Sequence, residues 1–379
     1  MGWLKLKEAG LKDGHIRKLM NIYNRYDELF LEENFRLFNS ELKRNLEKSR
    51  NINLNSKIEL YKRNKVRIID ANSQGYPEKL KELTDYPLFL YVKGKELKKG
   101  LNDERRNIAV VGTRKVTKFG KSACEKIVRE LLEYEVTLIS GLAEGIDTVA
   151  LSASVEKDGS AIAVVGSGLD IVYPYENKIL WEKISEKGIL ISEHPLGTKP
   201  LKWNFPKRNR IIAALSDGIL IAESFKSGGA LITAELGFIM DKEIFAVPGF
   251  INYPSFEGCN NLIKENKAKL VTTGEDIAKE FLWDLKNRKN KTDKLTYEEK
   301  IVFLQLSEEY GLEEIMKKIK NFNMDNDNNK NRNTLFENEF RPEENSIDIP
   351  VNKLLSILMS LKVKGLITET GTARYMRIV

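Results

Sequence analysis

Cationic and aromatic side chains alternate in residues 199–215. The segment from 199 to 210 contains no acid and carries five cations, Lys199, Lys202, Lys207, Arg208 and Arg210, with Trp203 and Phe205 between them. Cations neutralise phosphate oxygens, and aromatic faces stack on unpaired bases. An apolar run from Ile211 to Leu215 follows, so we expect the cluster to open a helix, whose free N–H groups suit a phosphate. Taken alone, the segment fits a solvated charged loop with two core aromatics equally well.

Four turns rich in small residues follow predicted strands. Their candidate phosphate-binding residues are Gly112, Thr113, Arg114, Ser140, Gly141, Gly166, Ser167, Gly168, Ser227, Gly228 and Gly229. Glycine lets a ligand approach the backbone, and an arginine such as Arg114 can form a bidentate pair with phosphate. The first turn is not G-x-G-x-x-G, which disfavours dinucleotide binding. In a parallel sheet, such turns would share one edge and form a rim for an anionic ligand.

No catalytic or metal-binding constellation is predicted. Two histidines and two cysteines, without metal-type spacing, disfavour a metal site or a disulfide framework. Possible acids, none of which the sequence pairs, are Glu144, Asp147, Asp170, Glu193 and Glu235. We interpret each as a helix cap or salt-bridge partner. We therefore expect no cofactor and no enzymatic activity.

Bulk composition favours a soluble cytoplasmic protein of two or three domains. The chain has 379 residues, 41% of them hydrophobic, and a net charge of +7. This charge permits nucleic-acid binding without requiring it. The start lacks a signal-peptide apolar region, and no apolar run approaches the roughly 18 residues of a membrane span.

Strand-like apolar runs alternate with helical patterns between residues 67 and 285. The runs lie at residues 108–111, 137–139, 161–165, 189–191, 218–221 and 244–247. Near-continuous apolar strands with helical crossovers indicate a parallel sheet covered on both faces. We therefore predict an α/β fold, with an extended Rossmann-like, doubly wound, mostly parallel sheet.

The flanking segments predict two smaller domains. Residues 1–66 read as helices, and the Gly10 to Gly14 turn resembles that of a helix-hairpin-helix or SAM-like domain, although a plain helical bundle fits the pattern better. Residues 286–294 form a polar linker. Residues 295–379 show helices and a final hairpin near Gly371, the pattern of a winged helix, with an Asn-rich insert at 321–345 that we expect to be disordered.

Taken in order, these turns resemble the DprA/Smf family, the DNA-processing proteins of natural transformation. The matching motifs run through about 70–285 and are Val111-Gly-Thr-Arg114, Ser140-Gly-Leu-Ala-Glu-Gly-Ile-Asp147, Val165-Gly-Ser-Gly-Leu-Asp-Ile-Val-Tyr-Pro174, Phe205-Pro-Lys-Arg-Asn-Arg-Ile-Ile-Ala213, Ser227-Gly-Gly-Ala-Leu-Ile-Thr-Ala234, Ala246-Val-Pro-Gly249 and Gly258-Cys-Asn-Asn-Leu-Ile263. The flanking segments match only loosely.

The resemblance implies a non-catalytic protein that binds single-stranded DNA, protects incoming DNA and loads the RecA recombinase. It implies a homodimer formed through the α/β domain. The DNA pocket would use Arg114, Gly166 to Gly168, and the segment Lys207, Arg208, Asn209 and Arg210. Two residues depart from the family pattern. Glu144 stands where many members carry a basic residue, which weakens the local positive potential. Tyr175 stands where some members carry a basic residue, so a ring that can stack on a base replaces a phosphate contact.

Phe256, Leu262 and Ile263 are candidates for the dimer interface, since they form a short apolar stretch after the last family turn. The same three residues fit a core position equally well.

Two other functions compete with DNA binding. Residues 227–235 have the Gly-Gly and Glu spacing of nucleotide phosphoribohydrolases of the lysine-decarboxylase-like group, but Leu231 and Ile232 replace their Gly and Thr. A transcriptional regulator led by the winged helix is disfavoured, because residues 351–364 contain three lysines and no arginine to recognise guanine.

Overall fold

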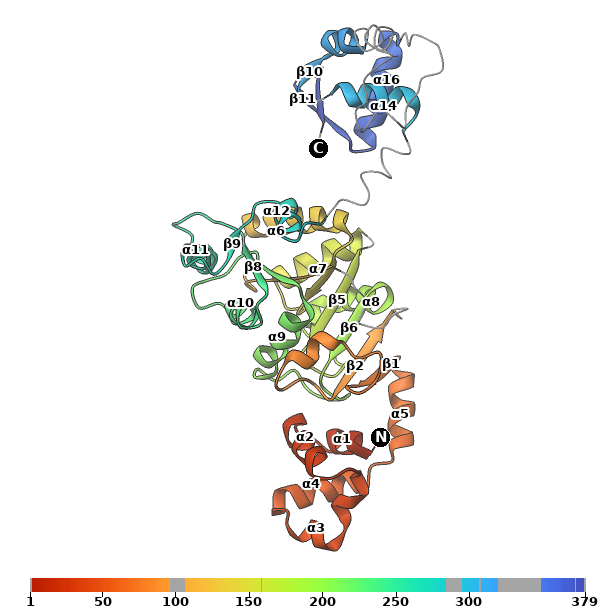
Figure 1. Cartoon of the computed structure of the whole chain (residues 1–379), viewed down its shortest axis with the longest axis vertical. Coiled ribbons are helices and arrows are strands. Elements are labelled where there is room, and N and C mark those ends of the chain that lie inside the picture. Colours follow the sequence, from red (N-terminus) through yellow and green to blue (C-terminus); the bar gives the residue numbers. More distant parts are fainter. Residues whose placement is uncertain are drawn as a thin grey trace, which may run out of the picture. The chain divides into compact units, whose positions relative to one another are not determined.

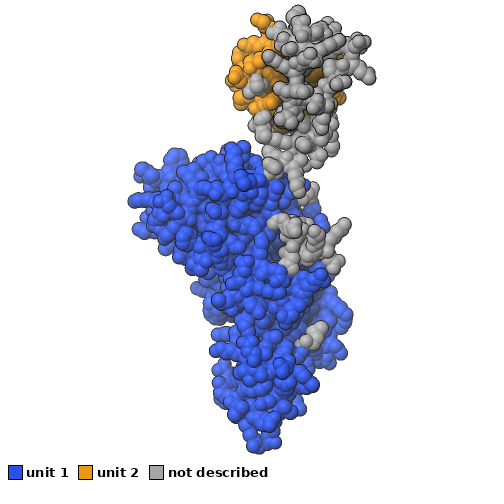
Figure 2. All heavy atoms as spheres, in the orientation of Figure 1, with its two compact units in different colours: residues 1–284 blue, residues 285–379 orange. Residues whose placement is uncertain are grey.

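A computed structural model of the chain describes residues 2–95, 106–157, 159–283, 295–306, 308–319, 349–371 and 373–377. Two units, residues 1–284 and residues 285–379, are coloured separately in Figure 2. The predicted linker at 286–294 and the Asn-rich insert at 321–345 lie outside the described residues.

The described part of the first unit is built on a nine-stranded sheet in the order β1-β2-β6-β5-β4-β3-β7-β8-β9 (Figure 1). The strands from β6 to β9 in this order run parallel, whereas β2 pairs antiparallel with both β1 and β6. The strands are Val66–Asp70 (β1), Phe89–Gly94 (β2), Asn107–Val111 (β3), Thr137–Ser140 (β4), Ser160–Val165 (β5), Ile189–Ser192 (β6), Gly218–Ile221 (β7), Glu243–Ala246 (β8) and Lys269–Leu270 (β9). The predicted mostly parallel sheet is confirmed.

Helices cover both faces of this sheet, as the apolar strands require. In β5, Ile162 and Val164 belong to the core beneath α9, whereas Ala163 and Val165 belong to the core beneath α7 and α8. Burying a Val or Ile side chain stabilises the fold by about 1.5–3 kcal/mol relative to exposing it. The helices are Lys118–Leu131 (α6), Ile146–Glu156 (α7), Lys178–Lys187 (α8), Asn204–Leu215 (α9), Gly229–Ile239 (α10), Glu257–Lys264 (α11) and Gly274–Glu280 (α12).

The strand order reverses direction between β3 and β7. From β3 the chain adds β4, β5 and β6 on one side, and β7 then returns to pair with the other edge of β3. In open α/β sheets, ligands bind outside the carboxyl ends of the strands at such a switch point. A ligand site is therefore expected among the loops that follow the parallel strands.

Five helices precede the sheet and share a core with its antiparallel end. They are Gly2–Glu8 (α1), Asp13–Ile22 (α2), Glu32–Arg36 (α3), Ser40–Arg50 (α4) and Leu54–Arg63 (α5). Leu6 and Ile16 are fully buried, in a cluster that includes Phe89 of β2. The Glu8 carboxylate also accepts hydrogen bonds from the hydroxyls of Tyr61 and Tyr91, at 2.5 and 3.0 Å.

The second unit has the element order of a winged helix. Its described elements are Tyr297–Gln305 (α14), Tyr310–Gly311 (β10), helical residues 312–319, Val351–Val363 (α16), Ile367–Gly371 (β11) and Arg374–Arg377 (β12). The strands form an antiparallel sheet in the order β10-β12-β11. Buried residues such as Val302, Leu354 and Leu361 hold the helices against it. The predicted hairpin is confirmed.

Candidate nucleic-acid interface

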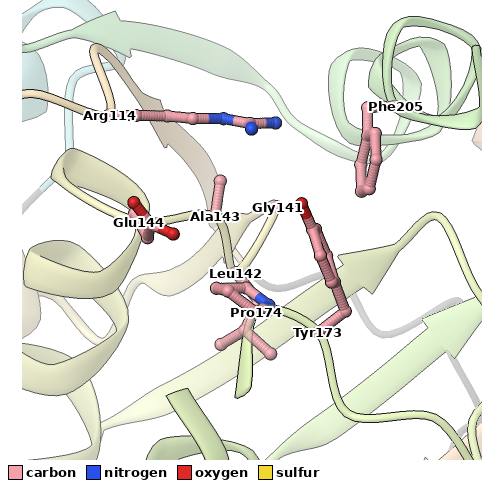
Figure 3. A pocket seen from close by; sticks show the side chains of 8 residues that line it. All are labelled: Arg114, Gly141, Leu142, Ala143, Glu144, Tyr173, Pro174 and Phe205. Carbon is pink, nitrogen blue, oxygen red and sulfur yellow. The ribbon is translucent and has the colours of Figure 1, made fainter. Parts of the chain in front are cut away.

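A shallow pocket opens at the carboxyl ends of β3 and β4, beside the loop that follows β5 and the start of α9 (Figure 3). Its lining residues are Arg114, Gly141, Leu142, Ala143, Glu144, Tyr173, Pro174 and Phe205. It combines one cation, one carboxylate and two aromatic rings with a short run of backbone. Two of the four predicted turns contribute Arg114 and Gly141 to it, the cationic–aromatic segment contributes Phe205, and Tyr173 and Pro174 come from the residues that follow the third turn.

The loop after β3 directs Arg114 into this pocket. Gly112 has no room for a Cβ, which would lie 2.5 Å from Cγ1 of Ile146. The amide of Thr113 donates to the carbonyl of Glu223 at 2.8 Å, which joins this loop to the one after β7. Arg114 itself is exposed, and its guanidinium lies 5.5 Å from the centre of the Phe205 ring. Among the described residues, no carboxylate pairs with it.

Tyr173 and Phe205 form an aromatic pair beside Arg114. Their ring centres lie 5.4 Å apart, with an angle of 33° between the ring planes. Gly166 accommodates Phe205, because a Cβ there would lie only 3.2 Å from the ring. The side-chain amide of Asn204 donates to the carbonyl of Gly166 at 2.9 Å, which fixes the start of α9 against this turn.

The loop after β4 is held from inside. Ser140 is fully buried and donates to the carbonyl of Val110 at 2.6 Å, so its hydroxyl faces β3 and not the pocket. The Asp147 carboxylate accepts the amides of Gly141 and Ala143 at 3.1 and 3.3 Å. Burial raises the pKa of Asp147. Glu144 is exposed at the rim of the pocket, where it lowers the local positive potential.

Arg208 lies beneath the pocket. It is 4% exposed, and it donates to the carbonyls of Gly141, at 2.5 Å, and Val164. Its Nε donates to Asn209 at 3.1 Å. Burial lowers the pKa of Arg208 to about 10, although Asp147 acts in the opposite direction. This arginine therefore positions the pocket loop. We expected from the sequence that it would face solvent, but its side chain is buried.

Arg210 is also buried, in a different network. It is 6% exposed and donates to Glu193 at 2.6 Å, while Asp85 lies 3.1 Å from its Nε. Burial raises the pKa of Glu193, but Arg210 and Lys207 outweigh it and the net shift is downward. Lys207 is exposed, and its Nζ lies 3.2 Å from the same carboxylate. The cations of this segment therefore differ in exposure. Arg208 and Arg210 are buried, whereas Lys207 lies on the surface.

The remaining candidate residues are spread around the pocket. Ser167 and Gly168 are buried, and the amide of Gly168 donates to the carbonyl of Thr198 at 2.9 Å. Tyr175 is 70% exposed, and Lys178 lies 5.9 Å from its ring centre. The turn of Ser227, Gly228 and Gly229 starts α10 and does not line the pocket.

The predicted dimer residues have mixed environments. Phe256 is fully buried, so it presents no surface to a second copy of the chain. Leu262 and Ile263 are half-buried and pack partly against the core of the sheet.

Sequence reasoning left Tyr173 out of the candidate site. The only signal is its place after the Gly-Ser-Gly turn, since a sequence does not show that its ring meets Phe205.

Among the described residues, no cluster of three or more His, Cys, Asp or Glu side chains could hold a metal ion. The helices described here are also too short or too polar to cross a membrane.

Comparison with known proteins assigns this unit to a characterised group. A family model described as DNA recombination-mediator protein A matches residues 67–282. The chain is 43% identical over 207 residues to the DNA processing protein DprA of Streptococcus pneumoniae, covering 54% of this chain and 71% of that protein. It is 41% identical over 219 residues to protein Smf of Escherichia coli, covering 58% and 57%.

Two solved structures resemble the fold. The X-ray structure of DNA processing protein A from Streptococcus pneumoniae matches with a TM-score of 0.64 and 34% identity, over 75% of this chain and 98% of that chain. The structure of DNA processing protein A from Helicobacter pylori, described for its single-stranded DNA binding mode, matches with a TM-score of 0.52 and 27% identity, over 57% and 95%.

Proposed function

Because the chain belongs to the DNA recombination-mediator protein A family, we propose that it binds single-stranded DNA in the pocket of Arg114, Tyr173 and Phe205. The observation that carries this proposal is the guanidinium of Arg114, which is exposed, has no carboxylate partner among the described residues and lies 5.5 Å from the centre of the Phe205 ring. A cation beside aromatic faces matches the two parts of a nucleotide, because the cation attracts the phosphate and the rings stack on the base. A duplex hides its base faces, so such a pocket favours a single strand.

Further exposed groups extend the binding surface around the start of α9. Lys199 and Lys202 are exposed and have no carboxylate partner among the described residues, and Trp203 between Lys202 and α9 is 69% exposed. Tyr175 and Lys178 provide a second exposed ring and cation nearby in the chain. We propose that the strand runs over these groups, while Lys207 contributes from the first turn of α9. Arg208 and Asn209 support the surface from below.

Within the same proposal, bound DNA is protected and passed to the RecA recombinase, and the protein acts as a homodimer. The family description, a recombination mediator, supports the first step. For the dimer, Leu262 and Ile263 on α11 lie next to the edge strand β9, since the amides of Lys267 and Ala268 donate to the carbonyl of Leu262. Leu270 of that strand is 50% exposed. Together they would form a self-complementary apolar face.

An enzymatic role has less support from the geometry. The phosphoribohydrolase comparison depends on Glu235, which is exposed on α10 and does not line the pocket. Leu231, which replaces a glycine of that motif, is half-buried at the start of the helix. Base release needs a carboxylate positioned at the sugar–base bond. We therefore propose that the chain is not a nucleotide hydrolase.

A gel-shift titration tests the proposal. The purified full chain is titrated with a single-stranded oligonucleotide and with its duplex, across a series of salt concentrations. We expect tighter binding to the single strand, with affinity falling by about 0.7 log units per tenfold salt for each phosphate neutralised. Equal affinity for both forms, or no dependence on salt, would refute the proposal.

A further inference from the structure

Three exposed aromatic rings lie together outside the pocket, at the switch point of the sheet. Phe119 is the second residue of α6, which follows β3, and Phe250 and Tyr253 belong to the loop after β8. Phe250 lies 5.7 Å from Phe119 and 5.6 Å from Tyr253, measured between ring centres. The three side chains are 45%, 63% and 54% exposed, in the order Phe119, Phe250 and Tyr253. Neither the pocket nor the start of α9 contains any of them.

The loop that carries Phe250 and Tyr253 is anchored at several points. The side-chain amide of Asn260 makes two hydrogen bonds with the backbone of Gly249, at 3.0 and 3.1 Å. The amide of Tyr253 donates to the carbonyl of Phe250 at 3.0 Å and closes a turn between the two rings. The buried ring of Phe256 supports Phe119 from below, at 5.4 Å. These exposed rings are therefore held in place by the fold.

Hydrogen bonds connect this cluster to the pocket along the sheet edge. The amide of Ile146, next to the pocket loop, donates to the carbonyl of Thr113 at 3.2 Å. The amide of Thr113 donates in turn to the carbonyl of Glu223, and the amide of Gly258 donates to the carbonyl of Ser224, both at 2.8 Å. The loops after β3 and β7 and the start of α11 thus form one continuous rim, with Arg114 on the part that lines the pocket. Asn260 of α11 joins the loop after β8 to this rim through its hydrogen bonds with Gly249.

Cations border this rim. Lys115, on the loop after β3, and Lys118, the first residue of α6, are exposed, and no carboxylate among the described residues pairs with either. Lys226 is also exposed, although its Nζ lies 3.4 Å from Glu257. Single-strand binding surfaces combine such cations with aromatic rings on which successive bases stack. An apolar protein interface would instead be depleted in lysine at its centre.

We propose that Phe119, Phe250 and Tyr253 form a second stacking platform for unpaired bases, which continues the DNA path from the pocket across the switch point. The proposal rests on the proposed function, because it requires a single strand in the pocket. The bases would lie against the outward faces of Phe250 and Tyr253. Lys115 and Lys118 would contact the phosphates that connect the two places.

The length of the oligonucleotide distinguishes binding at the platform from binding in the pocket, because only a long strand can reach both. We would measure the affinity of the full chain for oligonucleotides of roughly four and about twenty nucleotides, which span the site sizes of single-strand binding modules. The double variant Phe250→Ala/Tyr253→Ala should bind the long strand at least about fivefold more weakly, as expected for the loss of one stacked base, with little change for the short strand. Ile251→Ala is the matched control, since Ile251 is 93% exposed in the same loop but has no aromatic face.

A second readout does not depend on a truncated side chain. Phe250→Trp should retain long-strand affinity, and its added fluorescence should be quenched by the long oligonucleotide but not by the short one. The platform is refuted if the double variant keeps wild-type affinity for the long strand while wild-type binding stays salt-dependent, a result that leaves the proposed function intact. It is also refuted if Ile251→Ala changes the mass measured by light scattering, because the loop would then contact a second copy. If the wild type does not bind a single strand at all, both proposals fail.

Discussion

Arg208 donates a hydrogen bond to the carbonyl oxygen of Gly141 at 2.5 Å, which fixes the pocket loop from its buried side. The same guanidinium bonds to the carbonyl of Val164 in β5. One buried cation thus joins α9, the loop after β4 and a central strand. The pocket surface depends on this internal contact, although Arg208 does not line the pocket.

Replacing Arg208 by alanine should destabilise the protein. The change leaves Asp147 in a buried site without its nearby cation and removes the hydrogen bonds to two buried carbonyls. Leaving a buried hydrogen-bonding group without its partner costs about 1–3 kcal/mol for each group. Urea denaturation followed by circular dichroism measures this loss. A variant with wild-type stability would show that Arg208 is dispensable for the fold.

Replacing Arg114 by alanine should weaken DNA binding and leave the fold intact. Arg114 is exposed, and surface substitutions of this kind usually change stability by less than about 0.5 kcal/mol. The lost charge-assisted contact should cost about 1–3 kcal/mol of binding to a single strand. Fluorescence anisotropy gives the affinity, and a thermal melt checks the fold. Arg129→Ala is a suitable control, because Arg129 is exposed on α6 and pairs with Glu156, away from the pocket lining.

Replacing Glu144 by lysine should strengthen DNA binding. Glu144 is the carboxylate in the lining of the pocket, and its replacement changes the local charge by two units. If the new lysine neutralises one more phosphate, the slope of log affinity against log salt should steepen by about 0.7. Glu182→Lys makes the same change in net charge on the exposed surface of α8. Equal gains in the two variants would mean that only net charge matters.

His194 should make stability depend on pH. Burial lowers the pKa of His194 to about 4, against the opposing effect of Glu193 and with smaller contributions from Lys7, Lys207 and Asp13. Its pKa in the unfolded chain is about 6.5. Between about pH 6.5 and pH 4, the imidazole is therefore protonated in the unfolded state but remains neutral in the folded state. Stability should therefore fall as pH drops from about 6.5 to 4, by on the order of 2–3 kcal/mol.

Urea denaturation at several pH values measures this dependence. The His194→Gln variant has no titrating ring at this position. Its free energy of unfolding should therefore fall less between pH 6.5 and 4 than that of the wild type, by the amount that His194 contributes. An unchanged pH profile in this variant would assign the dependence to other groups.

The sequence predicted the sheet well and the orientation of side chains poorly. Short, β-branched apolar runs such as residues 108–111, repeated between helical patterns, indicate parallel strands covered on both faces. The burial of Arg208 had no comparable signal. Its guanidinium faces inward because the carbonyl of Gly141, far away in the sequence, lies beneath α9, and a pattern of cations cannot show this. The pairing of Tyr173 with Phe205 likewise depends on how two loops meet.

The short edge strand β9 of the large sheet affects how the protein associates at high concentration. At one edge β9 has two residues, one of them Lys269, which pairs with Glu280; at the other, β1 is paired to the sheet through β2. Very short or lysine-bearing edge strands resist the addition of strands from neighbouring molecules. We therefore expect the β9 edge to discourage fibril growth at high protein concentration. Contacts between copies at β9 would then be made by side chains and would remain reversible.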